Sequence, residues 1–486
     1  MQQFPPNTAL SVYYTTIAQK YNLTNEGIFY IDLWPFAPPQ MILASPESAD
    51  LVTKVSNYPL HELGVEYLAL LVGENAMGAT NGETWKRTHR LLAPAFKASN
   101  LKTLVGVMAG QVGGLFVSRL RECAADGRVF SMDDAAARLL LSISTEVILG
   151  GHIGEQDKAR LFGDIGDIVA YATVITMTTS SNPVVKWIAW WRKVRAVKRI
   201  DAFFKGLVRA RYAVVREGVA KRKDTAAGMS ILDRTLIEGR ENDWSDKNEL
   251  DVASERLLID NLKGLILGAY GTTTDTLCAV FIMLAAHPEV VQKVREEHNQ
   301  VFGDMENTRQ LLDDNPYKLN ELHYTTAVIK ETLRLFPIGF TPRKSPPRTS
   351  TLTYKDKSYP TANQMIIPCQ HTIHYDPTLF PSPSKFDPER FIDPNVVPTG
   401  AWRPFERGPR ACTGRDLAID ELRLVLLLTI RQFDFELPDL EPRTTPRAQF
   451  TDMDLRLGDL AFQENAFSAK PRGGSMMRVR LAQKSE

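Results

Sequence analysis

The spacing of hydrophobic and polar residues is helical over most of the chain. From about residue 83 to about residue 430, apolar positions recur at intervals that place them on one face of a helix. Four of the expected helices matter for function. The first begins near Gly82, the second spans roughly 256–286, and the third spans roughly 321–336. The fourth runs from just after Cys412 to about Phe433. Pro337 is expected to end the third, because proline cannot continue the hydrogen-bond ladder.

Shorter segments have the pattern of strands and loops. Residues 28–31 and 40–43 are β-type runs, residues 476–481 alternate like a strand, and the proline-rich stretch 342–409 predicts loops and short strands. We therefore predict a mainly α fold with a minor β-sheet region. A length of 486 residues alone would suggest about three domains. No shift in composition supports a split, so we expect one domain over 1–486, with 1–26 as an N-terminal segment.

The most apolar stretch lies in the second of these helices. Residues 264–286 are nearly uncharged and long enough to cross a bilayer. Their centre, from Gly271 to Thr276, is small or polar, which would be costly in lipid. We interpret the segment as a helix buried in the protein with a polar notch at its middle.

Composition and charge exclude several classes of protein. Hydrophobic residues make up 44% and charged residues 24%, which is ordinary for a globular protein. Lys plus Arg total 58 and Asp plus Glu total 57, a balance that argues against a nucleic-acid partner. The four cysteines, Cys123, Cys278, Cys369 and Cys412, form no C-x-x-C pair, so a disulfide framework or a four-cysteine zinc site is not expected.

One cysteine lies in an unusual loop, Phe405-Glu-Arg-Gly-Pro-Arg-Ala-Cys412-Thr-Gly414. Glycines and a proline bracket Cys412, and a helix follows at once. Backbone N–H groups at a helix N-terminus favour an anionic sulfur, and Arg410 adds positive charge nearby. A thiolate could ligate a soft metal. The alternative is a buried cysteine that acts as a small hydrophobic residue.

The loop matches F-x-x-G-x-R-x-C-x-G at every fixed position and so resembles the haem-binding signature of the cytochrome P-450 family. The resemblance implies that Cys412 is the axial ligand of haem b iron. It also implies that Arg410 pairs with a haem propionate, that Phe405 packs beside the sulfur, and that Gly414 completes the loop. In this family the long central helix passes over the haem on the oxygen side.

Two further motifs resemble the family's structural core. Glu331 and Arg334 match E-x-x-R, and Arg390 lies in Pro-Glu-Arg-Phe. The resemblance implies a buried network of these three residues, whereas an i,i+3 pair alone could be an ordinary surface ion pair. His371 and His374 precede this element, and we interpret both as structural rather than metal-binding.

A second set of residues is similar to those that hold the haem propionates. Trp85 and His89 resemble W-x-x-x-R, with histidine in the place of arginine, and Arg343 lies where the family often has another arginine. Histidine can still donate to a carboxylate. The alternative for this helix is a basic face in water.

The notch from Gly268 to Thr273 aligns with A-G-x-D/E-T-T, and Thr272 then matches the threonine that takes part in proton delivery. The alternative is a hydroxyl bonded to its own helix carbonyl. Ala269 replaces the usual glycine and Gly271 replaces the usual acid. Asp275 could substitute for that acid through water, or could be a buried structural partner. This departure keeps open an isomerase, a dehydratase or a peroxide-using enzyme without a reductase.

The resemblance implies a monooxygenase that inserts one atom of O2 into a lipophilic small molecule, by hydroxylation, epoxidation or oxidative coupling. Electrons would come from NADPH through a flavoprotein reductase that docks near Arg403, Arg407 and Arg415. The amino-acid sequence of the loop is most similar to that of filamentous-fungal members, many of which act in secondary metabolism. We expect a monomer; a non-catalytic haem sensor is the alternative from another class. The expected substrate contacts are apolar or small, which suits such a substrate: Ala269, Thr272, Ile338, Gly339, Phe340, Ala466 and Phe467.

Residues 183–216 combine Trp187, Trp190 and Trp191 with many basic residues. This mixture suits a lipid interface and predicts a peripheral membrane contact, although a basic amphipathic helix in water has the same pattern. No N-terminal membrane span is visible in residues 1–26. We therefore expect either a soluble protein or one at the cytosolic face of the endoplasmic reticulum whose leading anchor is absent from this chain.

Overall fold

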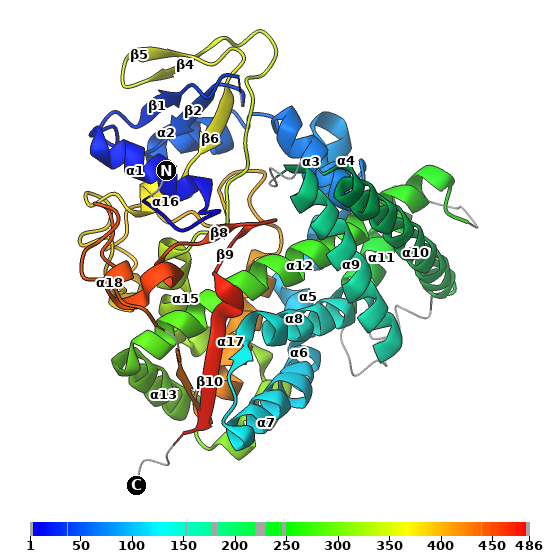
Figure 1. Ribbon diagram of the computed structural model, residues 1–486. Helices are drawn as coiled ribbons and strands as arrows, with labels where there is room; N and C mark the ends of the chain where they lie inside the picture. Colours follow the sequence, from blue (N-terminus) through cyan, green and yellow to red (C-terminus); the bar gives the residue numbers. More distant parts are fainter. Residues whose placement is uncertain are drawn as a thin grey trace.

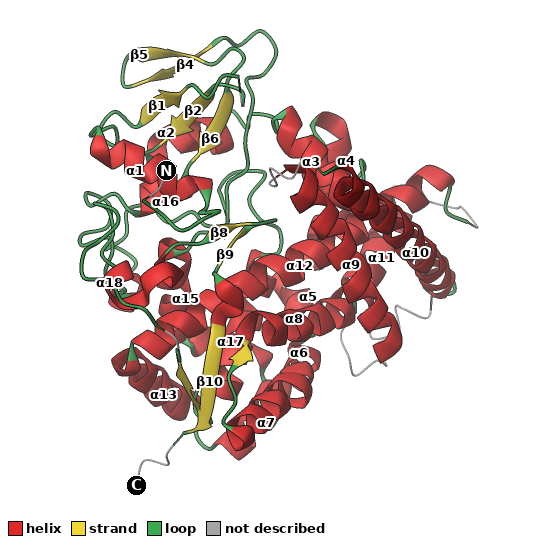
Figure 2. Cartoon of the chain, viewed as in Figure 1, coloured by secondary structure: helices red, strands yellow, loops and turns green. Residues whose placement is uncertain are grey.

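A computed structural model describes residues 3–35, 37–150, 153–176, 182–218, 229–242, 244, 249–438 and 440–482. Helices dominate it, and small sheets lie at its edges (Figures 1 and 2). The mainly α fold predicted from the sequence is confirmed. The α-helices are α1 Leu10–Lys20, α2 Pro46–Asp50, α3 Glu62–Val72, α4 Gly82–Leu92, α5 Ala98–Lys102, α6 Val105–Gln111, α7 Ser118–Asp126, α8 Met132–Leu149, α9 Glu155–Thr176, α10 Pro183–Arg216, α11 Ile231–Asn242, α12 Val252–Ala286, α13 Pro288–Phe302, α14 Thr308–Asp314, α15 His323–Leu335, α16 Gln370–His374, α17 Arg415–Thr429 and α18 Asp454–Leu457.

The strands form four small sheets. β1 (Ile28–Ile31), β2 (Gln40–Leu43) and β6 (Met365–Pro368) form one, with β1 antiparallel and β6 parallel to β2. β3 (Phe130–Ser131), β10 (Met476–Leu481) and β7 (Phe433–Glu436) form a second antiparallel sheet. Two hairpins complete the set: β4 (Thr351–Tyr354) with β5 (Lys357–Pro360), and β8 (Glu464–Asn465) with β9 (Ala469–Lys470).

The long helix α12 crosses the middle of the molecule, with α8, α9 and α10 on one side of it (Figure 1). It begins where the Asp251 side chain accepts a hydrogen bond from the Ser254 N–H and ends at His287, just before Pro288. Its length and composition would allow it to cross a membrane, but most of its apolar window is buried in the protein. This burial agrees with the interpretation of a core helix.

The main hydrophobic core surrounds α12 and includes side chains from α8, α15 and α17. Two smaller apolar clusters lie near the sheet of β1, β2 and β6. The predicted helix ends were close: α15 stops at Leu335, before Pro337, while α12 starts about one turn earlier than expected. The last of the four expected helices, α17, begins only at Arg415 and ends at Thr429, because β7 starts at Phe433.

Candidate functional site

The loop that carries Cys412 is closed on itself and seated against the N-terminal part of the chain. The Cys412 N–H donates to the Phe405 carbonyl at 2.9 Å, and Gly414 is the N-cap of α17. Gly408 has a φ of +83°, and a Cβ there would lie 2.2 Å from the Thr53 carbonyl oxygen. Only glycine therefore allows the loop to approach the π-helical turn Leu51–Val55 so closely.

The Cys412 side chain is accessible to solvent, but many protein atoms lie around its sulfur. This partial burial raises the pKa of the thiol. The Gly414 N–H and the charge of Arg415 oppose this rise. Arg410, which the sequence suggested as the charge that favours a thiolate, is directed elsewhere. The charge expectation is therefore corrected: the protein alone favours the thiol, and a bound cation such as a metal would be needed to reverse this.

Two guanidinium groups nearby, one buried and one half-buried, have no carboxylate partner among the described residues. Arg343 is 1% exposed; its Nη1 donates to the Tyr58 carbonyl at 3.0 Å, and its Nε has no hydrogen-bond partner. The Nη2 of Arg410 donates to the Thr80 carbonyl and to Asn81 Oδ1, both at 3.0 Å. Burial and the charge of Arg343 lower the pKa of Arg410 to about 10. Such a pair needs a negative group, and the two carboxylates of haem fit this need.

Helix α4 adds an aromatic and a titratable side chain to this guanidinium pair. The Arg410 guanidinium lies over the Trp85 ring, 4.4 Å from its centroid, and the Trp85 and His89 ring centroids are 5.2 Å apart. Burial and the charge of Arg410 lower the pKa of His89. The structure thus brings together the four residues that the sequence suggested for the propionates, Trp85, His89, Arg343 and Arg410.

Glu331, Arg334 and Arg390 form a buried network, which we call the core ion network. Arg334 donates to Glu331 at 2.7 and 2.8 Å, and Arg390 Nε donates to Glu331 Oε1 at 3.2 Å. The remaining Arg334 N–H groups bind the carbonyls of His374, Pro383 and Lys385. All three network side chains are largely buried, so these groups stabilise the fold and do not face a ligand.

The side chains of His371 and His374 are also buried in the core and make hydrogen bonds there. The Nδ1 of His374 lies 3.0 Å from the Arg334 carbonyl, and its Nε2 accepts from the Arg403 N–H at 3.1 Å. His371 Nδ1 lies 2.7 Å from Thr15 Oγ1. Within the described ranges, no group of three His, Cys, Asp or Glu side chains could hold a metal ion. These contacts support the structural interpretation of both histidines.

The middle of α12 is less buried than the rest of the helix, and we refer to the solvent-accessible space beside it as the hollow. Residues 268–272 are only half-buried, whereas most of the helix on either side is buried. Thr272 lies on this stretch, and its hydroxyl donates to the Gly268 carbonyl at 2.7 Å. The local bond that we considered as an alternative therefore forms, and it leaves the oxygen lone pairs of Thr272 free to accept a hydrogen bond.

Asp275 does not share a hydrogen bond with Thr272. Its carboxylate accepts a hydrogen bond from the Ser468 hydroxyl, on the turn between β8 and β9. Burial raises the pKa of Asp275 to about 7, and the Ser468 bond and Lys470 oppose this rise. Of the two interpretations drawn from the sequence, the contacts favour the structural partner.

The expected substrate contacts fall into two groups. Ile338 packs against the main core, its carbonyl accepts the Ala469 N–H at 2.7 Å, and this bond brings the strand after Phe467 to the segment before Gly339. Phe340 instead packs against Tyr14, at 6.0 Å between ring centroids, in one of the small clusters beside the first sheet. Ile338 and Phe340 thus pack against different apolar clusters, and the role of Phe340 as a substrate contact stays a prediction.

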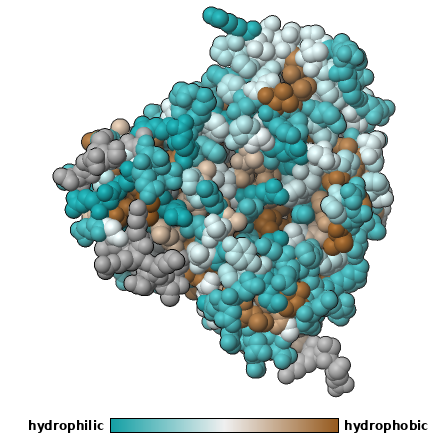
Figure 3. Space-filling model, turned by 180° about the vertical axis from the view of Figure 1, so that it is seen from behind, coloured by the Kyte–Doolittle hydropathy of each residue, from teal (hydrophilic) through white to brown (hydrophobic). Residues whose placement is uncertain are grey.

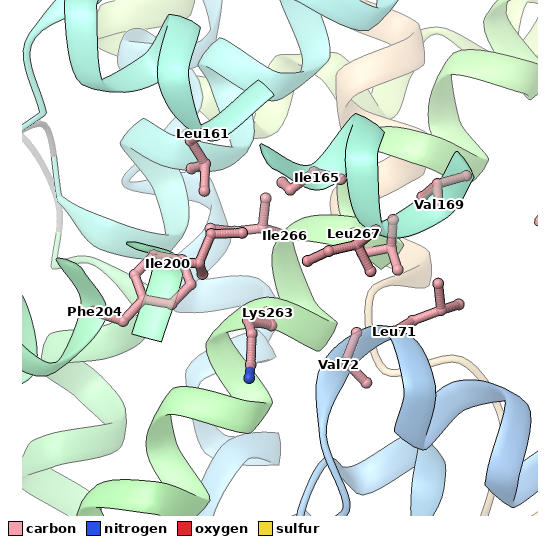
Figure 4. Close-up of a pocket in the computed structure, with 11 residues that line it drawn as sticks. Leu71, Val72, Leu161, Ile165, Val169, Ile200, Phe204, Lys263, Ile266 and Leu267 are labelled. Atoms are coloured by element: carbon pink, nitrogen blue, oxygen red, sulfur yellow. The ribbon is translucent and has the colours of Figure 1, made fainter. Parts of the chain in front are cut away.

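The sequence did not reveal an apolar pocket between α3, α9, α10 and α12. Figure 4 shows Leu161, Ile165 and Phe204 facing Ile266 and Leu267 across it. Lys263 borders the pocket but directs its amino group away, towards Asp201 and Asp260 at 2.8 and 3.1 Å. The i,i+4 spacing of Leu161 and Ile165 could have indicated this apolar face, but not what it packs against.

The surface residues expected to meet partners differ in exposure. Arg403 is 1% exposed and pairs with Glu406 and Asp50, so it cannot present charge to a reductase; that expectation was wrong. Arg407 is half-buried and also pairs with Asp50, while Arg415 is exposed. On α10, Trp187, Trp190 and Trp191 are all exposed. The face in Figure 3 is mainly hydrophilic, with separate apolar patches.

Comparisons with known proteins agree with this geometry. The family model of cytochrome P-450 matches residues 4–455. Cytochrome P-450 monooxygenase acrF from Aspergillus aculeatus is 32% identical over 496 residues, covering 96% of this chain and 96% of that protein. Cytochrome P-450 monooxygenase polC from Polytolypa hystricis is 27% identical over 99% of this chain and 86% of its own length. Cytochrome P-450 monooxygenase ptmJ from Penicillium ochrochloron is 27% identical over 89% and 80%.

The family match covers nearly the whole chain, including the Cys412 loop, the core ion network and α12. Relatives of similar length share the same family name at moderate identity. On these findings, the chain belongs to the cytochrome P-450 family of haem-thiolate monooxygenases.

Proposed function

We propose that this enzyme binds haem b through the Cys412 thiolate and inserts one oxygen atom from O2 into a lipophilic small molecule. The observation that carries the proposal is the guanidinium pair close to the Cys412 loop: buried Arg343 and half-buried Arg410 have no carboxylate partner among the described residues. Bound through a thiolate, haem supplies the activation of molecular oxygen. The residues of this chain hold the group, exclude water and deliver protons.

In this proposal Arg343, Arg410 and His89 hold the two propionates, and Trp85 fixes Arg410 by stacking. The hollow beside α12 accepts the substrate. Its wall includes Ala269, Thr272, Ile338, Gly339 and Ala466, whose side chains are small or apolar, and this suits a lipophilic compound. The pocket between α3, α9, α10 and α12 is also lined mainly by apolar side chains, which is consistent with the same preference.

Thr272 is proposed to position a water that delivers protons on the oxygen side. Its hydroxyl hydrogen is directed to the Gly268 carbonyl, so Thr272 Oγ1 can accept a hydrogen bond from this water, which is then the proton donor. Gly271 supplies no acid, and the carboxyl of Asp275 is engaged with Ser468. A Thr272→Ala variant should therefore consume NADPH with less product per electron, which product yield against NADPH oxidation measures.

The missing acid at Gly271 also favours a second candidate, an isomerase, a dehydratase or a peroxide-using enzyme of the same family. Turnover that requires both O2 and NADPH supports the monooxygenase. Turnover without either reagent, or with peroxide alone, supports the second candidate.

For partners, the proposal adds a flavoprotein reductase that takes electrons from NADPH and docks near the exposed Arg415. The proposal also includes a role in secondary metabolism, which the resemblance of the Cys412 loop to filamentous-fungal members suggests. The exposed tryptophans of α10, beside Lys186, Arg192 and Arg195, suit a peripheral contact with the cytosolic face of the endoplasmic reticulum.

Replacement of the thiol tests the central assignment. The purified protein, reduced under carbon monoxide, should give a thiolate-type Soret band, and Cys412→Ser should abolish this band. As a matched control, Cys369→Ser replaces a thiol that is buried in a small apolar cluster, and it should keep the band. A wild-type protein without the band, or a Cys412→Ser variant that retains it, contradicts the proposal.

A further inference from the structure

The turn between β8 and β9 lies against Gly271, one of three glycines in α12. A Cβ added to Gly271 would lie 3.9 Å from two ring carbons of Phe467. The ring is half-buried and packs against the main core. The position at which related sequences have an acid is therefore covered by an aromatic ring from the C-terminal hairpin.

Several contacts hold this hairpin, but one of them is next to the ring. Ser468, the neighbour of Phe467, donates its hydroxyl hydrogen to the Asp275 carboxylate. Asp275 lies one turn along α12 from Gly271, so both halves of the arrangement come from the same two elements. Backbone bonds from Ala469 to Ile338 and from Asn465 to Asn7 hold the hairpin at points further from the ring.

The surroundings of Asp275 keep this bond in either protonation state. The charged groups that act on Asp275 are Asp133 of α8, Lys470 of β9 and Glu464 of β8, and Lys470 pairs with Asp133 at 3.3 Å. A carboxylate accepts the Ser468 hydroxyl hydrogen, and a protonated acid can donate to or accept from the same oxygen. A buried carboxyl without Ser468 would lose its hydrogen-bond partner, which favours the closed arrangement.

We propose that the bond between Asp275 and Ser468 latches Phe467 over Gly271, so that this ring sets the size of ligand that the hollow accepts. This inference rests on the proposed haem site and assigns two roles within it. Phe467 is a specificity-determining residue, and Asp275 with Ser468 are positioning residues that act through it. The proposal replaces a proton-relay role for Asp275 by a mechanical one.

Two nitrogen ligands of different size test the latch in the haem-loaded enzyme. Imidazole and 4-phenylimidazole both shift the Soret band on binding, so their Kd values can be measured without turnover. Loss of the ring in Phe467→Ala should weaken 4-phenylimidazole by about threefold to tenfold, because apolar contact is lost. Imidazole should change less than about twofold, because it is too small to reach the ring.

The positioning variants should reproduce this pattern without touching the ring. Ser468→Ala and Asp275→Leu are expected to lower the preference for 4-phenylimidazole in the same direction as Phe467→Ala. Ser468→Thr keeps a hydroxyl and Asp275→Asn keeps an acceptor, so both variants should retain the wild-type preference for 4-phenylimidazole. Ser118→Ala, which removes an exposed hydroxyl on α7, is the matched control and should leave both Kd values unchanged.

Two results would overturn the inference. If Phe467→Ala leaves the ratio of the two Kd values unchanged, the ring does not face the hollow. If Phe467→Ala changes the ratio but Ser468→Ala and Asp275→Leu do not, the latch is wrong. Failure of the haem site itself would appear separately, as a wild-type protein without a thiolate-type Soret band. Variants are compared only at equal intensity of that band, so loss of folding is not mistaken for loss of the latch.

Discussion

Two groups of buried arginines in this molecule have opposite hydrogen-bond environments. All five N–H donors of Arg334 have acceptors, two of them on Glu331. Arg343 is equally buried, yet within the described part of the chain its side chain makes one hydrogen bond, to a carbonyl. Because a buried cation without a counter-charge costs free energy, the second arrangement is stable only when something else supplies the charge. The contrast separates residues that build the fold from residues that await a ligand.

Removal of the shared acid should give the largest effect. Glu331→Gln leaves Arg334 and Arg390 in the core without their counter-charge, and breaking such a buried pair costs about 3–5 kcal/mol. The free energy of unfolding in urea, together with the yield of haem-loaded protein, measures this loss.

A matched substitution at another buried acid shows whether charge is the cause. Glu421 on α17 is fully buried, its two oxygens lack hydrogen-bond partners among the described residues, and burial raises its pKa well above the usual range. The Thr273 hydroxyl lies close enough to lower that pKa, but not in hydrogen-bond geometry. Burial disfavours the charged form of Glu421, and no cation pairs with it among the described residues, so Glu421→Gln removes no ion pair and should cost less than about 1 kcal/mol. An equal loss in both variants would contradict the contrast.

Acid should destabilise the protein through histidines beside the core ion network. Burial and the charge of Arg334 lower the pKa of His371 to about 3, against 6.5 ordinarily. The unfolded chain therefore binds a proton that the folded chain refuses. Stability is full above about pH 6.5 and falls by about 1.4 kcal/mol per pH unit down to about pH 3.

The comparison of His371→Gln with the wild type isolates this contribution. The variant should lose less stability than the wild type between pH 7 and pH 5, a difference of about 2 kcal/mol. Urea midpoints at the two pH values measure it. Parallel losses in both proteins would show that His371 is not the group that takes up the proton.

A substitution in the guanidinium pair should have the smallest effect on the stability of the haem-free protein. Its effect on the affinity for haem should be larger. Arg410→Met removes a cation that lacks a counter-charge, so the haem-free protein should change by less than about 1 kcal/mol. Haem should bind about tenfold more weakly, which corresponds to about 1.4 kcal/mol. Transfer of haem to a scavenger protein measures the affinity, and Arg407→Met, at a half-buried arginine paired with Asp50, is the control.

The sequence was informative where residues that act together are close in the chain. The Cys412 loop and the Glu331–Arg334 pair are local motifs, so their resemblance to short motifs of the family was enough to find them. The bond between Ser468 and Asp275 joins residues 193 positions apart, and no local pattern marks it. Arg403 was expected to present charge to a reductase; its burial follows from contact with α2 and Thr53, far away in sequence.

The close approach of Gly408 to Thr53 has a consequence for biosynthesis. The seat for the thiol loop is made by residues near position 50, while Arg403, which binds Thr53 Oγ1 at 3.0 Å, lies 350 residues further on. A nascent chain on the ribosome holds one half of this contact long before the other half is made. Capture of the prosthetic group must then wait until nearly the whole polypeptide has been translated.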